Sequence, residues 1–582
     1  MISRYCLLIL FISYFSDLAY SQARKNFIEP DAGQEHWVDS VFKKLKRKER
    51  IGQMFFVRAH TNLGKAYEDS VAEVIKKNKV GGLVFFQGGT GRQEALTRYY
   101  QSISQVPLLI AMDAEWGLGM RLDSTISYPY QMTLGAIQDN NLIYQMGVEI
   151  AKDFKRLGMQ LNFAPVSDIN NNPRNPVINY RSFGDNKYNV AIKAAAYLNG
   201  LQDGGTLVSI KHFPGHGDTD VDSHSDLPQL NFSKKRLDSL ELYPFKELIA
   251  KGASGVMVAH MNIPALDSTP HVPSTLSKPI VTGLLKEELG FKGLVISDAM
   301  EMKGVTKYFP DGEADIRAII AGNDIVELSE NTERAIRLTR EAIKAKRLKR
   351  EQVNASVKKI LAAKYWAGLS RPQGKDTSAI YNFLNRFDAT SLNQRLCDAA
   401  VTVLKSDSLL KVANPVDKTA VIGLGVTDVS LFQRELGQSF PNATNFLLSK
   451  IASEVDINKV RNELKSYKQI IVAIHDYRKR PQSTLDYNST LKKFITELTA
   501  MNSIVCVFAN PYTITGLPGV ERSKSLILGY QNSDEMQRAI AKLISGKIPA
   551  SGRLPVTVSP LLKNGDGIQY FPVPPTVSGQ VQ

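Results

Sequence analysis

The sequence predicts an α/β protein with a (β/α)₈ barrel of the TIM type followed by a smaller α/β sandwich domain. Its 582 residues exceed what one hydrophobic core usually supports, and 43% hydrophobic with 22% charged residues is ordinary for globular domains. Short apolar, β-branched runs alternate with helical patterns between about residues 50 and 330. A second set of such runs follows GLSRPQGKDTS (368–378), which is typical of a linker.

Eight apolar runs are the predicted barrel strands: QMFFV (53–57), GLVFF (82–86), LLIAM (108–112), LNFAPV (161–166), LVSIK (207–211), VMVAH (256–260), LVISD (294–298) and DIVEL (324–328). Polar residues end or follow these runs: Arg58, Gln87, Asp113, Asp168, Lys211, His212, His260, Asn262, Asp298 and Glu327. Because barrel enzymes keep their chemistry at the C-terminal ends of the strands, these residues form a first map of an active site. An open, doubly wound sheet is the structural alternative, but it would gather ligands at a single switch point.

The second domain is predicted to contain further βα units. Its expected strands are TAVIGLG (419–425), IIVAIH (470–475), IVCVFAN (504–510), SLILGY (525–530) and RLPVTV (553–558). It carries no glycine-rich phosphate loop and no nucleophile elbow, so no independent chemistry is expected in it. The predicted boundaries are a barrel over 30–370, a linker over 371–380, a sandwich domain over 381–570 and a flexible tail over 571–582.

Residues 1–21 have the pattern of a signal peptide, with Arg4, an apolar run and small residues at a cleavage position. An uncleaved anchor is the alternative, but the run is short and Asp17 interrupts it. We therefore expect an exported protein, periplasmic or extracellular, with no transmembrane span after cleavage. Cys397 and Cys506 lie in apolar surroundings, which favours buried thiols over a disulfide.

The net charge is +15, and removal of residues 1–21 leaves it unchanged because one basic and one acidic residue are lost. Such a charge favours anionic polymers or surfaces as partners. The basic runs 43–50 and 344–350 fall in helical patterns, however, and solvated helix faces also explain them. No nucleic-acid-binding motif accompanies the charge, so we expect no nucleic-acid partner.

The strongest chemical signal is KHFPGHGDTDVDSHSDLP (211–228), which contains three of the eight histidines and four aspartates. A metal site is one interpretation, with ligands from His212, His216, His224, Asp218, Asp220 and Asp222. It lacks an HxH pair or an HExxH helix, and its glycines favour a mobile loop over a rigid cage. General acid and base catalysis is the other interpretation, because Asp222 can hold one ring nitrogen of His224 while the other exchanges a proton.

Asp298 ends the apolar run LVIS, which would fix its carboxylate at the top of the barrel. A lone Asp after a strand often only caps the next helix. Together with the histidine loop, however, it becomes a candidate nucleophile, because glycoside cleavage needs a carboxylate on one side of the sugar and an acid on the other.

Several stretches of the chain resemble the β-N-acetylglucosaminidase branch of glycoside hydrolase family 3. They are KHFPGHGDTDVDSH (211–224), DAEWG (113–117), NYRSFGDN (179–186), VISDAMEM (295–302), AGND (321–324) and GKIPASGRLPVTV (546–558). The resemblance extends from about residue 35 to 560. It implies a retaining exo-acting enzyme that releases terminal N-acetylglucosamine (GlcNAc) from peptidoglycan fragments or chitooligosaccharides, without a cofactor or metal and as a monomer.

The resemblance also implies roles for individual residues. Asp298 matches the nucleophile, and His224 with Asp222 matches the acid/base dyad of the branch. The positions that would bind the sugar hydroxyls are Asp113, Arg181, Lys211 and His212. A β-glucosidase or a GlcNAc phosphorylase of the same family, and a non-catalytic sugar-binding barrel, are the alternatives.

Three positions depart from the family pattern. Trp116 and Leu118 occupy positions where glycine and arginine are frequent, although Arg121 aligns with a later arginine. Ala299 follows the nucleophile position, where an acidic residue is common. These departures predict a difference in how the sugar hydroxyls are recognised and in the electrostatic environment of Asp298.

Overall fold

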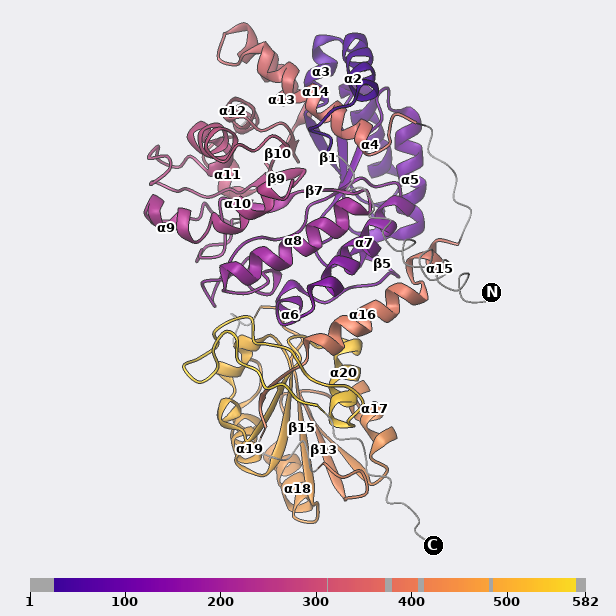
Figure 1. Cartoon of the computed structure of the whole chain (residues 1–582), viewed down its shortest axis with the longest axis vertical. Helices are drawn as coiled ribbons and strands as arrows, with labels where there is room; N and C mark the ends of the chain where they lie inside the picture. The colour runs from indigo at the N-terminus through magenta and orange to yellow at the C-terminus, as the bar shows by residue number, and fades with distance from the viewer. Residues whose placement is uncertain are drawn as a thin grey trace, which may run out of the picture.

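The computed structural model describes residues 26–223, 225–310, 312–371, 379–406, 413–480 and 485–571. The predicted signal peptide, most of the predicted linker and almost all of the predicted tail lie outside these residues, as does His224. The described chain forms two α/β units that follow one another along the long axis of the molecule (Figure 1).

The first unit is a closed barrel of parallel strands, which confirms the predicted fold class. Its strands are β1 (Phe55–Ala59), β2 (Gly82–Phe85), β4 (Leu109–Met112), β6 (Leu161–Asn162), β7 (Leu207–Val208) continued by β8 (Ile210–Phe213), β9 (Gly255–Val258), β10 (Leu294–Ser297) and β11 (Val326–Glu327). A bridge between Ile296 and Ile325 joins β10 to β11, and β11 pairs with β1, so the sheet closes on itself. Each of the eight predicted runs contains or overlaps one of these strands.

Helices alternate with the strands and cover the outside of the barrel (Figure 1). The main ones are α4 (Lys65–Asn78), α5 (Thr90–Ile103), α7 (Asn140–Arg156), α8 (Lys187–Asp203), α10 (Tyr243–Ala250), η4 (Pro279–Glu288), α12 (Glu313–Ala321) and α13 (Thr332–Lys344). The outer face of α13 is polar and its inner face apolar, with Ala335, Ile336 and Thr339 buried. The amphipathic pattern thus fixes which face of α13 packs inward.

Further elements extend the barrel at its ends and loops. They are α2 (Ala32–Lys44), α3 (Arg47–Gly52), β3 (Gly88–Gly89), η1 (Leu118–Met120), β5 (Leu122–Asp123), α6 (Gln131–Gly135), η2 (Asn179–Arg181), α9 (Lys234–Ser239), η3 (Ser274–Leu276), α11 (Lys303–Thr306) and α14 (Arg350–Trp366). Helix α14 packs against α2 and α3 beside the start of β1. The first and last helices of the barrel unit therefore meet at the N-terminal end of the strands.

The second unit is a sheet between two helical layers. Its strand order is β12 (Thr402–Lys405), β17 (Ser525–Leu528), β16 (Ser503–Phe508), β15 (Gln469–His475), β13 (Thr419–Leu424) and β14 (Ala443–Leu448), parallel except for β12. The helices of this unit are α16 (Phe387–Ala400), α17 (Leu431–Ser439), α18 (Glu454–Leu464), α19 (Ser489–Ala500), η5 (Pro511–Gly516), η6 (Val520–Arg522) and α20 (Asp534–Ile544). The preceding helix α15 (Ile380–Leu384) contacts the barrel helices α5 and α7. Helices α17 and α20 lie on one face and α18 and α19 on the other (Figure 1). This arrangement confirms the predicted sandwich.

The predicted last strand, RLPVTV (553–558), is wrong. This segment makes backbone hydrogen bonds to the barrel unit instead: the Arg553 amide donates to Ala136 O at 3.0 Å, and Pro555 O accepts from the Asp185 amide at 3.1 Å. Pro555 has no amide hydrogen to contribute to a ladder. The side chain of Asp185 in turn accepts from the Thr557 amide at 2.6 Å. The segment is therefore a strap between the two units.

Cys397 and Cys506 are both buried and unoxidised, as predicted. In the described part of the chain, no helix has the length and apolarity that crossing a membrane would require.

Candidate active site

A cavity of about 250 Å³ lies at the C-terminal ends of the barrel strands. Its wall contains side chains that the sequence analysis selected, namely Asp113, Arg181, Lys211, His212 and Asp298. These residues come from β8, from the ends of β4 and β10, and from η2, so the closed barrel is what brings them together. The volume suits a single sugar ring.

Lys211 is the centre of a buried charged network. Its Nζ lies 2.6 Å from Asp113 Oδ1 and 2.9 Å from Glu115 Oε1. Arg181 holds Glu115 from the other side through hydrogen bonds of 2.9 and 2.6 Å, and Arg121 donates to Asp113 at 2.7 Å. Each carboxylate therefore faces two cations.

The cations keep both carboxylates ionised. Burial by itself would raise the pKa of each carboxyl, but Lys211 and Arg121 hold the pKa of Asp113 well below its usual range. Against the same effect of burial, Arg181 and Lys211 lower the pKa of Glu115 to about 2. Ionised carboxylates only accept hydrogen bonds, whereas the three cations only donate them. The network therefore offers both kinds of partner that sugar hydroxyls require.

Glu115 is a site residue that the sequence analysis missed. It belongs to the stretch DAEWG, two residues after Asp113, and the alternation of an extended segment would have placed the two carboxylates on one side. Arg121 also explains the departure at Leu118. Leu118 is buried in the core, and Arg121 supplies the guanidinium that contacts Asp113.

Replacing Lys211 with methionine should destabilise the fold as well as reduce activity. Two buried carboxylates would lose their shared cation, which costs about 3 kcal/mol in the free energy of unfolding. Urea unfolding of Lys211→Met against the wild type measures this difference. The exposed Lys235→Met on α9 is a matched control and should unfold like the wild type; equal stability of both variants would contradict the role assigned to the network.

His212 is held in one tautomer by its neighbours. Its Nδ1 lies 2.7 Å from Asp168 Oδ2, and Arg181 Nη2 approaches Nε2 at 3.3 Å. Because a guanidinium can only donate, Nε2 accepts and Nδ1 carries the proton. Asp168 also accepts the His216 backbone amide at 2.7 Å. Asp168 is thus the buried anchor for this part of the loop, a role that its position after a strand did not reveal.

Asp298 lies at the cavity immediately after β10. Its backbone amide donates to Val258 O at 3.0 Å, and its Oδ1 accepts from the Ala299 amide at 2.8 Å. Ala299 O lies 3.1 Å from His260 Nε2, so the backbone beyond the strand is tied to the neighbouring strand end. These contacts fix where the carboxylate stands, as the run LVIS led us to expect.

Glu327 adds a second carboxyl group beside Asp298. It ends β11, its side chain is 3% exposed, and its Oε2 has no hydrogen-bond partner among the described residues. Burial raises the pKa of Glu327 well above its usual value, and the negative charges of Asp113 and Asp298 raise it further. Burial and the neighbouring negative charges therefore favour the protonated form of Glu327, which lines the cavity beside Asp298.

The variant Glu327→Gln should gain stability relative to the wild type as the pH rises. The native state holds the Glu327 proton above pH 4.5 and the unfolded state does not, so wild-type stability falls with rising pH in that window, by about 1.4 kcal/mol per pH unit at most. Glutamine cannot ionise and avoids this loss. Melting temperatures of both proteins between pH 4 and pH 9 measure the effect. A constant difference across that range would mean that Glu327 is ionised in the fold.

His216 is buried in the histidine loop and is not positioned as part of a ligand cage. Its Nδ1 lies 2.8 Å from Thr219 Oγ1, and its Nε2 lies 3.2 Å from Ser223 Oγ. Burial lowers the pKa of His216 to about 4. Within the part of the chain that the structure describes, no group of three His, Cys, Asp or Glu side chains is placed to hold a metal ion.

Three aspartates of the loop have structural partners. Arg236 donates to Asp218 at 2.6 Å and Asn172 to Asp220 at 2.6 Å. Lys307 donates to Asp226 at 2.8 Å. These aspartates tie the loop to surrounding elements, as expected for turn residues.

Of the proposed acid/base pair, Asp222 belongs to the described residues and His224 does not. The Asp222 carbonyl accepts the amides of Ser225 and Asp226 at 2.8 and 3.1 Å. Ser223 is 2% exposed and lines the same cavity as Asp298. His224, the next residue, lies outside the described residues, so its role stays a prediction.

The second unit also reaches the cavity, through Arg480. The Arg480 Nη2 donates to Val177 O at 3.4 Å, and its guanidinium lies 5.8 Å from the Tyr180 ring centroid. Nearby, Lys479 lies 5.6 Å from the ring of Trp116, the residue that departs from the family pattern. No sequence pattern indicates this contact, because it joins loops of separate domains.

The fold and the site together define a glycoside hydrolase, with a carboxylate-rich, sugar-sized cavity at the C-terminal face of a (β/α)₈ barrel. Residues 47–363 match the family described as "Glycosyl hydrolase family 3 N terminal domain". The chain therefore belongs to glycosyl hydrolase family 3, which confirms the resemblance found in the sequence.

Similar proteins have related names. The chain is 29% identical to beta-hexosaminidase A of Pseudoalteromonas piscicida over 84% of this chain and 91% of that protein. It is 24% identical to a beta-N-acetylglucosaminidase/beta-glucosidase of Cellulomonas fimi, over 89% and 95% of the two chains. The solved structure of a glycoside hydrolase family 3 beta-N-acetylglucosaminidase from Paenibacillus superposes with a TM-score of 0.75 at 29% identity, over 88% of this chain and 99% of that chain.

Proposed function

We propose that this chain is a retaining exo-β-N-acetylglucosaminidase that removes the non-reducing terminal GlcNAc from peptidoglycan fragments or chitooligosaccharides. The observation that carries the proposal is that Asp298 and Ser223, the residue before His224, line one sugar-sized cavity together with the network around Lys211. The names of the similar proteins support the choice of GlcNAc. The signal-peptide pattern supports action outside the cytoplasm, and we propose that the enzyme works as a monomer.

In the proposed mechanism the sugar sits over the charged network, with its hydroxyls bonded to Asp113, Glu115 and the cations around them. The imidazolium of His224, oriented by Asp222, protonates the glycosidic oxygen while the Asp298 carboxylate attacks the anomeric carbon. A covalent glycosyl-enzyme forms and the aglycone leaves. Neutral His224 then takes a proton from water, whose oxygen attacks the anomeric carbon and releases GlcNAc with retained configuration.

Phosphorolysis and glucoside cleavage are the alternatives that chemistry leaves open. A carboxylate base would repel an incoming phosphate, whereas a neutral imidazole would not. Release of p-nitrophenol from the β-glycosides of GlcNAc and of glucose, each with and without phosphate, separates the three activities. The proposal predicts turnover of the GlcNAc conjugate, little of the glucose conjugate, and free GlcNAc as the product with phosphate present. Formation of GlcNAc 1-phosphate, or a preference for glucose, would overturn it.

A mechanism-based label tests the nucleophile directly. A 2-fluoro glycosyl donor should form a stable adduct on the tryptic peptide GLVISDAMEMK (293–303), which contains Asp298. An adduct on another peptide would assign the nucleophile elsewhere. Absence of any adduct from an enzyme that turns over the aryl glycoside would contradict a covalent intermediate.

A further inference from the structure

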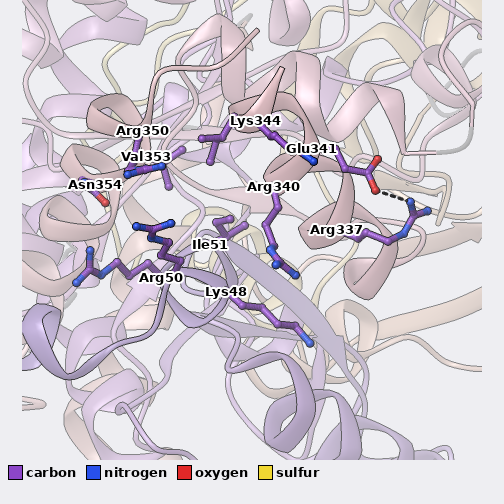
Figure 2. A pocket seen from close by; sticks show the side chains of 12 residues that line it. Lys48, Arg50, Ile51, Arg337, Arg340, Glu341, Lys344, Arg350, Val353 and Asn354 are labelled. Atoms are coloured by element: carbon purple, nitrogen blue, oxygen red, sulfur yellow. Dashed lines mark hydrogen bonds and ion pairs between the residues drawn. The ribbon is translucent and has the colours of Figure 1, made fainter. Parts of the chain in front are cut away.

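A second hollow, of about 480 Å³, lies at the opposite end of the barrel from the active site. Helices α3, α13 and α14 form it, and Figure 2 shows the side chains that line it. Helix α3 leads directly into β1, so the hollow lies beside the N-terminal ends of the strands. Figure 1 places these helices at the end of the barrel unit that is farthest from the second unit.

The hollow is strongly basic. Seven of its lining residues are cations, distributed over all three helices: Arg47, Lys48, Arg50, Arg337, Arg340, Lys344 and Arg350. On α13 the spacing of three, four and seven residues places its cations along one face, directed at α3. The basic runs 43–50 and 344–350, which the sequence analysis interpreted as separate solvated faces, therefore converge on one hollow.

Acidic partners are scarce around this hollow. Glu341 is the acidic residue of its wall, and it pairs with Arg337 at 2.9 Å. Among the described residues, no carboxylate forms an ion pair with Arg340, Lys344 or Arg350.

Two basic side chains near the hollow form ion pairs with carboxylates. Lys77 pairs with Glu333 at 2.7 Å, and Arg347 pairs with Glu313 at 2.7 Å. The charge of the hollow is thus concentrated, with a single ion pair to the described residues among its seven cations, whereas Lys77 and Arg347 are each paired with a carboxylate.

The hollow also has an apolar floor. Ile51 and Val353 are buried beneath the cations, at 3% and 2% exposure. Arg50 is fixed above this floor, because its Nη2 donates to Phe42 O at 3.1 Å and its guanidinium lies 3.8 Å from the Phe42 ring centroid. A recess with a floor and a rim of donors suits a discrete ligand better than a flat surface, and its volume lies in the range of small-ligand sites.

We propose that this hollow binds a soluble ligand that carries two or more phosphate groups. Planar guanidinium groups donate two parallel hydrogen bonds to a phosphate, and the rim offers several of them within one recess. Several clustered cations favour several clustered phosphates over one, because each phosphate removes part of the repulsion between the cations. The proposal does not depend on which glycoside the active site cleaves.

Isothermal titration calorimetry with tripolyphosphate and with orthophosphate tests the proposal on the mature protein. The wild type should bind tripolyphosphate at least about tenfold more tightly than orthophosphate, and added salt should weaken this binding. The triple variant Arg340→Gln/Lys344→Gln/Arg350→Gln should lose at least about tenfold in affinity for tripolyphosphate. Turnover of the aryl glycoside should be unchanged in this variant, since the hollow lies far from Asp298 along the strands.

A second triple variant, Lys292→Gln/Lys493→Gln/Arg522→Gln, is the matched control. It removes the same number of exposed positive charges from outside the hollow, and its affinity for tripolyphosphate should stay within about twofold of the wild type. Equal losses in the two triple variants would mean that net charge alone attracts the anion, and would overturn the proposal. The proposal would also be overturned if the wild type did not bind tripolyphosphate. The same conclusion would follow if the protein co-sedimented with phosphatidate-containing vesicles but had no affinity for tripolyphosphate.

Discussion

The variant Asp298→Asn should lose turnover by about four orders of magnitude or more. Asparagine keeps the shape of the side chain but has no carboxylate oxygen to form the glycosyl ester with the anomeric carbon, and removal of a catalytic nucleophile has losses of this order. Steady-state rates on the p-nitrophenyl β-glycoside of GlcNAc measure the effect. Binding of GlcNAc should persist, because the network around Lys211 is untouched.

Two further variants make this result specific. Asp203→Asn, at the exposed end of α8, is the same substitution away from the cavity and should keep wild-type rates. Asp298→Ala with added azide should regain activity and yield the α-glycosyl azide, because the small anion takes the place of the carboxylate. Near-normal rates for Asp298→Asn would remove this residue from the mechanism.

The variant His224→Ala should separate substrates by their leaving group. Protonation of the departing oxygen contributes about 10²- to 10⁴-fold, so cleavage of chitobiose should fall by that factor. The p-nitrophenyl glycoside has a good leaving group, so the rate at which this substrate forms the glycosyl-enzyme should fall much less. Single-turnover rates on both substrates give the comparison.

The control for this variant is His36→Ala, at an exposed position on α2, which should leave both rates unchanged. Asp222→Asn should show the same dependence on the leaving group in weaker form, because His224 would lose the carboxylate that orients it and stabilises its charge. If the rate of His224→Ala fell by the same factor on both substrates, this result would contradict the role of His224 as the acid.

The barrel and much of its site could be predicted because the required signals are local. Each strand is a short apolar run, and parallel strands that follow one another in a barrel end at the same face, so polar residues after them must converge. Asp113, Lys211 and Asp298 were found in this way. The contacts among site residues, such as the hydrogen bond between Asp168 and His212, depend on loop paths that strand periodicity does not encode.

Contacts between the two domains could not be predicted. Arg480 follows β15 in the second unit and reaches the cavity only because the two units are packed together. The hollow between α3 and α14 could not be predicted either, because most of the barrel separates its two basic runs in the sequence. The edge strands β12 and β14 were also missed, since β12 is short and antiparallel and β14 begins with half-buried and exposed residues.

The strap at 553–558 has a consequence for how this enzyme can be shortened. Its hydrogen bonds to the barrel unit involve Ala136 and Asp185. Asp185 lies four residues after Arg181, which donates hydrogen bonds to Glu115. In an enzyme truncated before the strap, the loop that carries Arg181 would lose its hydrogen bonds with the strap at its outer end. We therefore expect a gene cut at the apparent domain border to give a barrel with a loosened loop, because the C-terminal residues belong structurally to the barrel.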